Sequence, residues 1–148
     1  PPTCVIVAAS EPGGEGHAVA ASCAEIGIDT IRIPDASVAP ALFDGSVDLV
    51  VVGADAILAN GDLLNKTGTL AAALAARAAG IPVYAVASTD KIRPDTDVQL
   101  ETMPPAAVFP DRREGPPIQA SRFDRTPARL VTAYLTERGQ IPPDALPS

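Results

Sequence analysis

The apolar run at residues 49–52, inside the segment "VDLVVVG" at 47–53, constrains the fold more than any other feature. A strand with one face in water alternates apolar and polar residues, whereas four consecutive apolar residues require burial on both faces. Burial on both faces is the situation of a strand in a parallel sheet that helices cover on each side. We therefore expect residues 47–53 to form a strand inside such a sheet.

Further strand-like and helix-like segments alternate along the chain. Strands are expected at 3–9, 29–33, 47–53 and 82–88, and helices at 17–26, 37–43 and 69–79. This β-α-β-α-β-α-β order predicts an α/β fold, a Rossmann-like parallel sheet with right-handed crossovers and helices on both faces. The GxGxxG phosphate fingerprint is missing after the first strand, where "EPGGEG" resembles it only loosely.

The rest of the chain departs from this alternation. Residues 89–122 are rich in proline and charge and have little periodicity, which predicts an extended, Pro-rich arm or loop. In "FDRTPARLVTAYLTERG", Thr126 suits an N-cap and Pro127 suits the first helical position, so a C-terminal helix is expected up to the stop at Gly139. Residues 139–148 are expected to form a tail. The 148 residues have the length of one ordinary domain, and we expect a single one.

The composition excludes several kinds of partner. A net charge of −7 argues against general binding to nucleic acids. The 2 cysteines are too few for a disulfide framework, and the sequence has no cluster with zinc-ligand spacing, so we expect neither a metal nor a cofactor. Because no apolar run approaches the length of a membrane span and no signal peptide is present, we expect a cytoplasmic protein without a membrane partner.

The segment "GADAILANGDLLNKTGT" at residues 53–69 is the richest candidate for a site. Ligands of open α/β sheets collect at the carboxyl ends of the strands, and this segment leaves such an end. Asn65, Lys66 and Thr67 precede the expected helix at 69–79, whose free N–H groups and dipole favour an anion. They predict a phosphate-binding loop. The alternative is that Asn65 or Thr67 only caps the helix and that Lys66 is solvated.

Two other residues could take part in chemistry. Asp55 follows the expected buried strand, so its carboxylate is expected to be partly buried, which would suit a general acid or base. The alternative is that N–H groups of its own loop satisfy it. His17, the only histidine, follows a glycine-rich loop at the same rim, where a surface or capping role is favoured over catalysis.

Residues 53–69 fit the pattern GAD-x-[IVL]-x-x-N-G-x-[LV]-x-N-K-x-G-[TS], and the chain thereby resembles the initiation factor 2B alpha/beta/delta superfamily. "EPGGEGHAVAASCAEIGI" is similar to the family's S-R-P-x-x-E-G-R stretch, and "FDRTPARLVTAYLTERGQIPP" to its closing F-D-x-T-P helix. The superfamily includes regulatory subunits of the exchange factor for translation initiation, methylthioribose-1-phosphate isomerase and ribose-1,5-bisphosphate isomerase. The resemblance is to the C-terminal domain alone. The N-terminal helical domain, and the isomerases' catalytic cysteine in T-x-C-N-x-G, have no counterpart in these residues.

The resemblance implies roles for particular residues. Asp55 would be the acid/base of an aldose–ketose isomerase, Asn65 and Lys66 would hold the sugar phosphate, and Asn60 and Gly61 would shape the pocket. The implied function is a domain that binds a small phosphorylated sugar or a nucleotide-type ligand and is incomplete as a catalyst alone. The alternative is a non-catalytic regulatory or assembly domain. In either case a homodimer or a partner subunit is expected, because the family associates through this domain.

The chain departs from the family pattern at several positions, among them Ala120 and Ser121 in place of the N-P before x-F-D, and two of the departures replace arginines. Glu11 stands in place of the arginine of S-R-P, and His17 in place of the arginine of E-G-R. A carboxylate in place of an arginine removes a bidentate donor and adds repulsion toward phosphate. A pocket that has turned to a less anionic ligand, or to one with an amine for Glu11, is therefore a third interpretation. The complete candidate site comprises Glu11, His17, Asp55, Asn60, Gly61, Asn65, Lys66 and Thr67.

Overall fold

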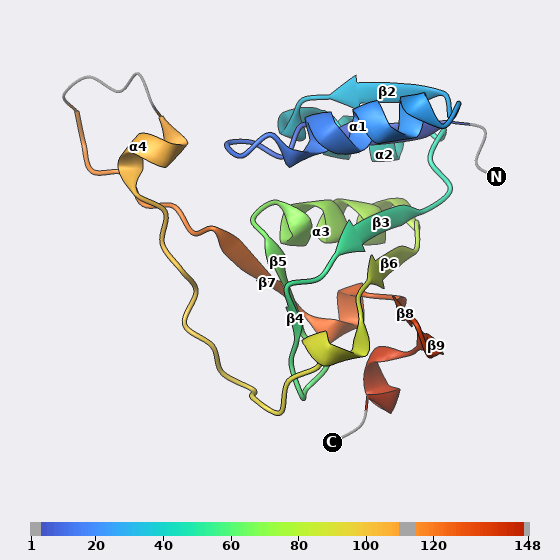
Figure 1. Cartoon of the computed structure of the whole chain (residues 1–148), viewed down its shortest axis with the longest axis vertical. Coiled ribbons are helices and arrows are strands. Elements are labelled where there is room, and N and C mark those ends of the chain that lie inside the picture. The colour runs from blue at the N-terminus through green and yellow to red at the C-terminus, as the bar shows by residue number, and fades with distance from the viewer. Residues whose placement is uncertain (1–3, 110–114, 147–148) are drawn as a thin grey trace.

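The chain opens with a β-α-β-α unit in the computed structural model, which describes residues 4–109 and 115–146. Its elements are β1 (Val5–Ala8), α1 (Glu15–Glu25), β2 (Thr30–Ile33), a 3-10 turn (Asp35–Ser37) and α2 (Val38–Phe43). Strands β1 and β2 pair in parallel. In Figure 1 this unit forms the upper layer of the molecule. The predicted alternation of strands and helices is confirmed here.

A four-stranded sheet forms the centre of the molecule below this unit. It comprises β3 (Val50–Gly53), β6 (Val83–Val86), β8 (Ala133–Thr136) and β9 (Gly139–Ile141), in that order. The first three strands are parallel, and β9 is antiparallel at the edge. Helix α3 (Thr69–Ala79) connects β3 to β6 with the bounds that the sequence predicts. Together with the first unit, this arrangement confirms the predicted α/β fold class.

The segment between β3 and α3 contributes two strands to a small antiparallel sheet. It contains β4 (Ala56–Ile57), β5 (Leu63–Lys66) and β7 (Phe123–Thr126), with β5 in the middle. The side chains of Ile57 and Leu63 are fully buried against Ala85 and Tyr134 of the central sheet. The candidate segment at residues 53–69 is therefore a hairpin anchored in the core, and β5 carries its polar residues toward α3.

A long excursion separates β6 from β7. It starts with a 3-10 turn (Thr89–Lys91) and carries the short helix α4 (Pro105–Val108) at its outer part. In Figure 1 it extends from the body, with α4 far from the central sheet. An isolated antiparallel bridge between Thr102 and Ser121 joins its outgoing and returning parts. The returning part leads into β7 and so closes the small sheet.

The predicted C-terminal helix is wrong. Residues 123–141 form β7, a 3-10 turn (Ala128–Leu130), β8 and β9, and a last 3-10 turn (Pro143–Ala145) follows where a tail is expected. Thr126, the expected N-cap, is fully buried and pairs with Leu63 in the small sheet. The buried hydroxyl of Tyr134 donates a hydrogen bond of 2.6 Å to the Gly61 carbonyl. These tertiary pairings outweigh a local sequence that would suit a helix.

The expected single sheet is divided between β1 and β3. Strand β1 pairs only with β2, and β3 pairs only with β6, among the strands of the described residues. The prediction that residues 49–52 are buried on both faces is wrong, because Leu49 is 48% exposed and Val51 is 58% exposed. Helix α2 packs against α3 and joins the two parts through Leu42 and Ala73. No helix of the described chain is long and apolar enough to cross a bilayer.

Packing of α1 on β1 depends on a glycine. A Cβ atom built on Gly16 would lie 1.8 Å from the backbone carbonyl oxygen of Ala8, at the end of β1. We predict that Gly16→Ala lowers the free energy of unfolding by about 1–3 kcal/mol, because the backbone must move to admit the methyl group. Urea denaturation measures this change.

The matched control is Ser22→Ala on the exposed part of the same helix. It is expected to change the free energy of unfolding by less than about 0.5 kcal/mol. Equal stability of the Gly16→Ala variant and the native protein would show that α1 does not sit as closely on β1 as the structure has it.

Candidate functional site

A cavity of about 760 Å³ lies between the free edges of β1 and β3. Its size is within the range of small-molecule sites. Val5, Val7, Val51, Ala71 and Ala72 contribute to its apolar walls, and Ser10, Glu15, Asn65, Lys66 and Thr67 line it with polar groups. These polar residues lie beyond the carboxyl ends of β1 and β3 or before α3, where ligands of open α/β sheets bind. The structure therefore brings together three of the predicted residues, Asn65, Lys66 and Thr67.

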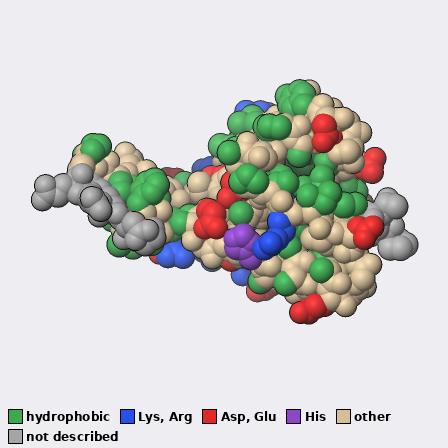
Figure 2. All heavy atoms as spheres, turned by 90° about the horizontal axis from the view of Figure 1, so that it is seen from above, with side chains coloured by type: hydrophobic (Ala, Val, Ile, Leu, Met, Phe, Trp, Pro, Cys, Tyr) green, Lys and Arg blue, Asp and Glu red, His purple; other side chains and the backbone are tan. Residues whose placement is uncertain are grey.

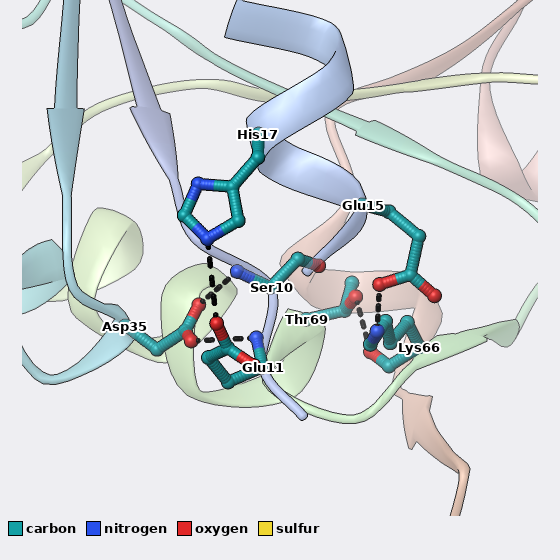
Figure 3. A network of polar contacts seen from close by, with 7 residues as sticks. All are labelled: Ser10, Glu11, Glu15, His17, Asp35, Lys66 and Thr69. Carbon is teal, nitrogen blue, oxygen red and sulfur yellow. Dashed lines mark hydrogen bonds and ion pairs between the residues drawn. The ribbon is translucent and has the colours of Figure 1, made fainter. Parts of the chain in front are cut away.

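The loop after β1 is held by Asp35 (Figure 3). The two carboxylate oxygens of Asp35 each accept a hydrogen bond of 2.9 Å, one from the backbone N–H of Ser10 and one from that of Glu11. Ser10 has a φ of 64°, a left-handed conformation that is uncommon for residues other than glycine. The bidentate contact from Asp35 compensates for this conformation and fixes the backbone that presents Glu11.

The side chain of Glu11 pairs with His17. Glu11 Oε1 lies 3.4 Å from His17 Nε2, and both side chains are more than half exposed. Figure 2 shows the His17 side chain at the surface of the molecule. Neither residue lines the cavity. The two residues that replace the family's arginines therefore contact each other beside the site.

Lys66 extends from the end of β5 into an ion pair with Glu15, in the first turn of α1. The hydrogen bond from Lys66 is the main cause that lowers the pKa of Glu15. Gly13 leaves room for the pair, because a Cβ there would lie 2.6 Å from Lys66 Nζ. Lys66 is thus not the solvated lysine of the alternative interpretation: its side chain is 22% exposed.

The predicted anion site at the start of α3 is already filled by Asp124. Its carboxylate accepts hydrogen bonds from the backbone N–H groups of Gly68, at 2.7 Å, and Leu70, at 3.1 and 3.2 Å. The expectation of free N–H groups there is wrong, because β7 brings this carboxylate to the helix terminus. Burial raises the pKa of Asp124 in spite of these hydrogen bonds. Nor do Asn65 and Thr67 cap the helix with their side chains.

Asn65 and Thr67 have other partners. Asn65 Nδ2 donates to Thr69 Oγ1 at 2.9 Å, and Thr69 Oγ1 donates to the Lys66 carbonyl at 2.8 Å. Thr67 Oγ1 donates to the carbonyl of Ser121 at 2.6 Å. These contacts fix the backbone around Lys66. They also connect it to the returning part of the excursion between β6 and β7.

Asn60 and Gly61 lie outside the cavity, at the turn between β4 and β5. Asn60 Nδ2 donates to Asp62 Oδ2 at 3.1 Å, within a turn that Asp62 stabilises by accepting from Arg125 Nε at 2.6 Å. Although burial opposes it, hydrogen bonds from Ala128 and Arg125 hold the pKa of Asp62 below its usual value. The structure gives this turn a role in joining the hairpin to the C-terminal segment.

Asp55 also lies outside the cavity. Its backbone N–H donates to the Leu64 carbonyl at 2.9 Å, and its side chain is exposed. The expected partial burial is wrong, because the small sheet buries Ala56 and Ile57 and leaves the residue before them in solvent. Among the described residues, the Asp55 carboxylate accepts no hydrogen bond.

Sequence reasoning missed the three carboxylates that organise the site: Glu15, Asp35 and Asp124. Each contacts a residue at least 24 positions away. A local signal existed for Glu15, since acidic residues favour the first turn of a helix. Asp124 stands within the F-D-x-T-P motif, but its place at the start of α3 follows only from the pairing of β7 with β5.

Comparison with known proteins gives consistent results. The family model described as the initiation factor 2 subunit family matches residues 3–143. The chain is 41% identical over 140 residues to a ribose 1,5-bisphosphate isomerase of Methanocaldococcus jannaschii, and the alignment covers 90% of this chain and 45% of that protein. It is 41% identical over 121 residues to a methylthioribose-1-phosphate isomerase of Gemmatimonas aurantiaca, and this alignment covers 79% of this chain and 35% of that protein.

Solved structures agree with these relatives. The 5-methylthioribose 1-phosphate isomerase from Pyrococcus horikoshii matches with a TM-score of 0.87 and 33% identity, over 95% of this chain and 42% of that one. The translation initiation factor eIF-2B, subunit delta, from A. fulgidus matches with a TM-score of 0.85 and 32% identity, over 94% of this chain and 43% of that one. The chain therefore spans less than half the length of these relatives.

We predict that Asp124→Ala lowers the free energy of unfolding by about 1–2 kcal/mol at neutral pH, because two N–H groups at the start of α3 lose their acceptor. Urea denaturation measures the change. Asp48→Ala, at an exposed carboxylate before β3, is the control and is expected to leave stability nearly unchanged. Equal effects of the two substitutions would contradict the capping role.

The difference in stability between the native protein and Asp124→Ala should also depend on pH. Because the pKa of Asp124 is raised in the folded state, the folded protein holds this proton more tightly than the unfolded chain does. The resulting stability is present below the ordinary pKa of 3.8 and is lost as the pH rises through the folded value. The stability difference between the native protein and Asp124→Ala should therefore be larger in acid than at neutral pH. A difference that grows toward neutral pH would contradict the sign of the shift.

Proposed function

The chain belongs to the initiation factor 2 subunit family, and from this we propose that it is a ligand-binding domain of the phosphosugar isomerase type. The observation that supports this most is the cavity of about 760 Å³ between β1 and β3, with Lys66 at its polar end. The named isomerases among its relatives act on ribose phosphates, and a small phosphorylated sugar fits the size of this cavity.

Lys66 is the residue we assign to the phosphate. A lysine supplies a compact positive charge, and the ammonium of Lys66 lies at a cavity wall rather than in open solvent. The hydroxyl group of Ser10 also lines the cavity and can donate to a phosphate or sugar oxygen, whereas the Thr67 hydroxyl already donates to the Ser121 carbonyl. The valine and alanine side chains of the walls would then contact the less polar part of the ligand.

Asp55 is the residue we assign to proton transfer, if the whole protein is an enzyme. An aldose–ketose isomerisation moves hydrogen between neighbouring carbon and oxygen atoms, which a carboxylate can assist by accepting and returning a proton. The Asp55 carboxylate follows β3, whose Gly53 lines the cavity, and it is exposed. We propose that these residues alone do not form a complete catalyst, since Asp55 lies outside the cavity wall.

A second candidate function is a non-catalytic domain that senses a ligand or assembles with a partner. It is favoured by the neutralised charges of the site: Glu15 pairs with Lys66, and Asp124 occupies the start of α3. One solved relative is described as a subunit of a translation initiation factor. In this function the excursion between β6 and β7, which carries the exposed Phe109, would contact a second copy or another subunit.

We predict that ribose 1,5-bisphosphate or methylthioribose 1-phosphate raises the melting temperature of the native protein by mass action. Lys66→Ala should weaken the affinity about tenfold or more, because the phosphate loses its charged partner. Thermal shift against ligand concentration measures both effects. Lys91→Ala removes the same charge outside the cavity and is the control. Equal affinities of the two variants would exclude Lys66 as the phosphate residue.

For catalysis, the variant to test is Asp55→Asn in the whole native protein. We expect kcat for sugar-phosphate isomerisation to fall by about 10²- to 10⁴-fold while ligand affinity changes little, because the amide cannot exchange a proton. Asp48→Asn is the matched control. Full activity of Asp55→Asn would overturn the assignment, whereas a native protein that binds the sugar phosphate without converting it would establish the non-catalytic function.

A further inference from the structure

We propose that Glu15 is an internal competitor for Lys66, so that an anionic ligand enters the cavity only by displacing the Glu15 carboxylate. Glu15 would then set the affinity and the charge selectivity of the site. The inference rests on the proposed function for the class of ligand, a phosphate-bearing small molecule, and adds to it a residue that controls access.

The geometry places Glu15 where a ligand anion would bind. Glu15 and Lys66 both line the cavity, although they lie 51 positions apart in the sequence. In Figure 3 the Glu15 side chain reaches from the start of α1 to the Lys66 ammonium. The Glu15 side chain is 63% exposed, whereas that of Lys66 is only 22% exposed. The carboxylate thus occupies the solvent side of a largely covered cation and can move away from it without leaving water.

The wall of the cavity itself offers one cation to an anion, although the more distant Arg122 also helps to lower the pKa of Glu15. Among the described residues that line it, Lys66 is the only basic one, and Glu15 and Asp35 are the only acidic ones. Asp35 already accepts the N–H groups of Ser10 and Glu11. As long as Glu15 holds Lys66, the wall offers an incoming phosphate no net positive charge. Removal of the Glu15 charge would leave Lys66 free and lower the repulsion at the same time.

The pair also connects two parts of the fold. Within the described chain, it is the only hydrogen bond or ion pair that joins the β1–α1–β2–α2 unit to the elements after it. A ligand that takes Lys66 from Glu15 therefore also releases the polar link across the cavity. Since α2 remains packed against α3, the unit stays attached while the start of α1 is freed.

A structural role of Glu15 and a competing role of Glu15 predict different effects of neutralising its charge. If Glu15 only stabilised the fold, its neutralisation would lower the melting temperature and leave anion affinity unchanged or reduced. If Glu15 competes with the ligand, neutralisation raises affinity, and the gain requires Lys66. Exposed ion pairs and nearby like charges have modest effects, so a gain of about three- to tenfold is expected at low ionic strength, and a smaller one in high salt.

The experiment measures binding of inorganic phosphate and of ribose 1,5-bisphosphate by calorimetry to the native protein, Glu15→Gln, Lys66→Ala and the double variant. Glu25→Gln is the matched control, since it removes the same charge from the last residue of α1, about 15 Å along the helix. We expect a three- to tenfold higher affinity for Glu15→Gln, less than a twofold change for Glu25→Gln, and no gain in the double variant. Glu15→Ser, which suits the first helical turn, repeats the test if Glu15→Gln folds poorly.

The inference and the proposed function fail in different ways. Unchanged or weaker binding of both probes by Glu15→Gln and Glu15→Ser, when the native protein binds through Lys66, overturns the inference alone. A gain for inorganic phosphate that depends on Lys66, together with no binding of ribose 1,5-bisphosphate to any variant, supports the inference and overturns the proposed ligand class. Absence of binding of either probe to any variant overturns both.

Discussion

The polar end of the cavity depends on one contact, that of the Asp124 carboxylate with the start of α3. It satisfies the N–H groups of Gly68 and Leu70 and ties β7 to the helix. Because β7 pairs with β5, the same contact fixes the strand that carries Asn65 and Lys66. A helix terminus that would otherwise attract an anion is thereby neutralised, which leaves Lys66 as the only basic residue among the described residues of the cavity wall.

The sequence predicted the elements that local signals define. The alanine-rich stretch before Gly80 predicted α3 with its observed bounds, and the apolar runs predicted β1, β2, β3 and β6. It failed at the C-terminus because the apolar spacing of Leu130, Val131 and Tyr134 suits a helix as well as a turn followed by a strand. Only contacts with distant residues, such as the one from Tyr134 to Gly61, decide between the two.

The same division holds for the site. Asn65, Lys66 and Thr67 could be placed from the sequence because they lie between a strand and a helix, where α/β folds bind ligands. Their partners could not be, since Glu15 reaches Lys66 from the first helix and Asp124 comes from the last part of the chain. The exposure of Asp55 could not be predicted either, because it depends on which residues the small sheet covers.

Close packing at Gly16 has a consequence for electrostatics. Because this residue has no side chain, the first turn of α1 packs directly on the end of β1. This close packing positions the neighbouring Glu15 within reach of Lys66. A larger residue would lift that turn and carry the carboxylate away from the lysine. The absence of one methyl group at Gly16 thus sets the distance between two charged side chains of the cavity wall.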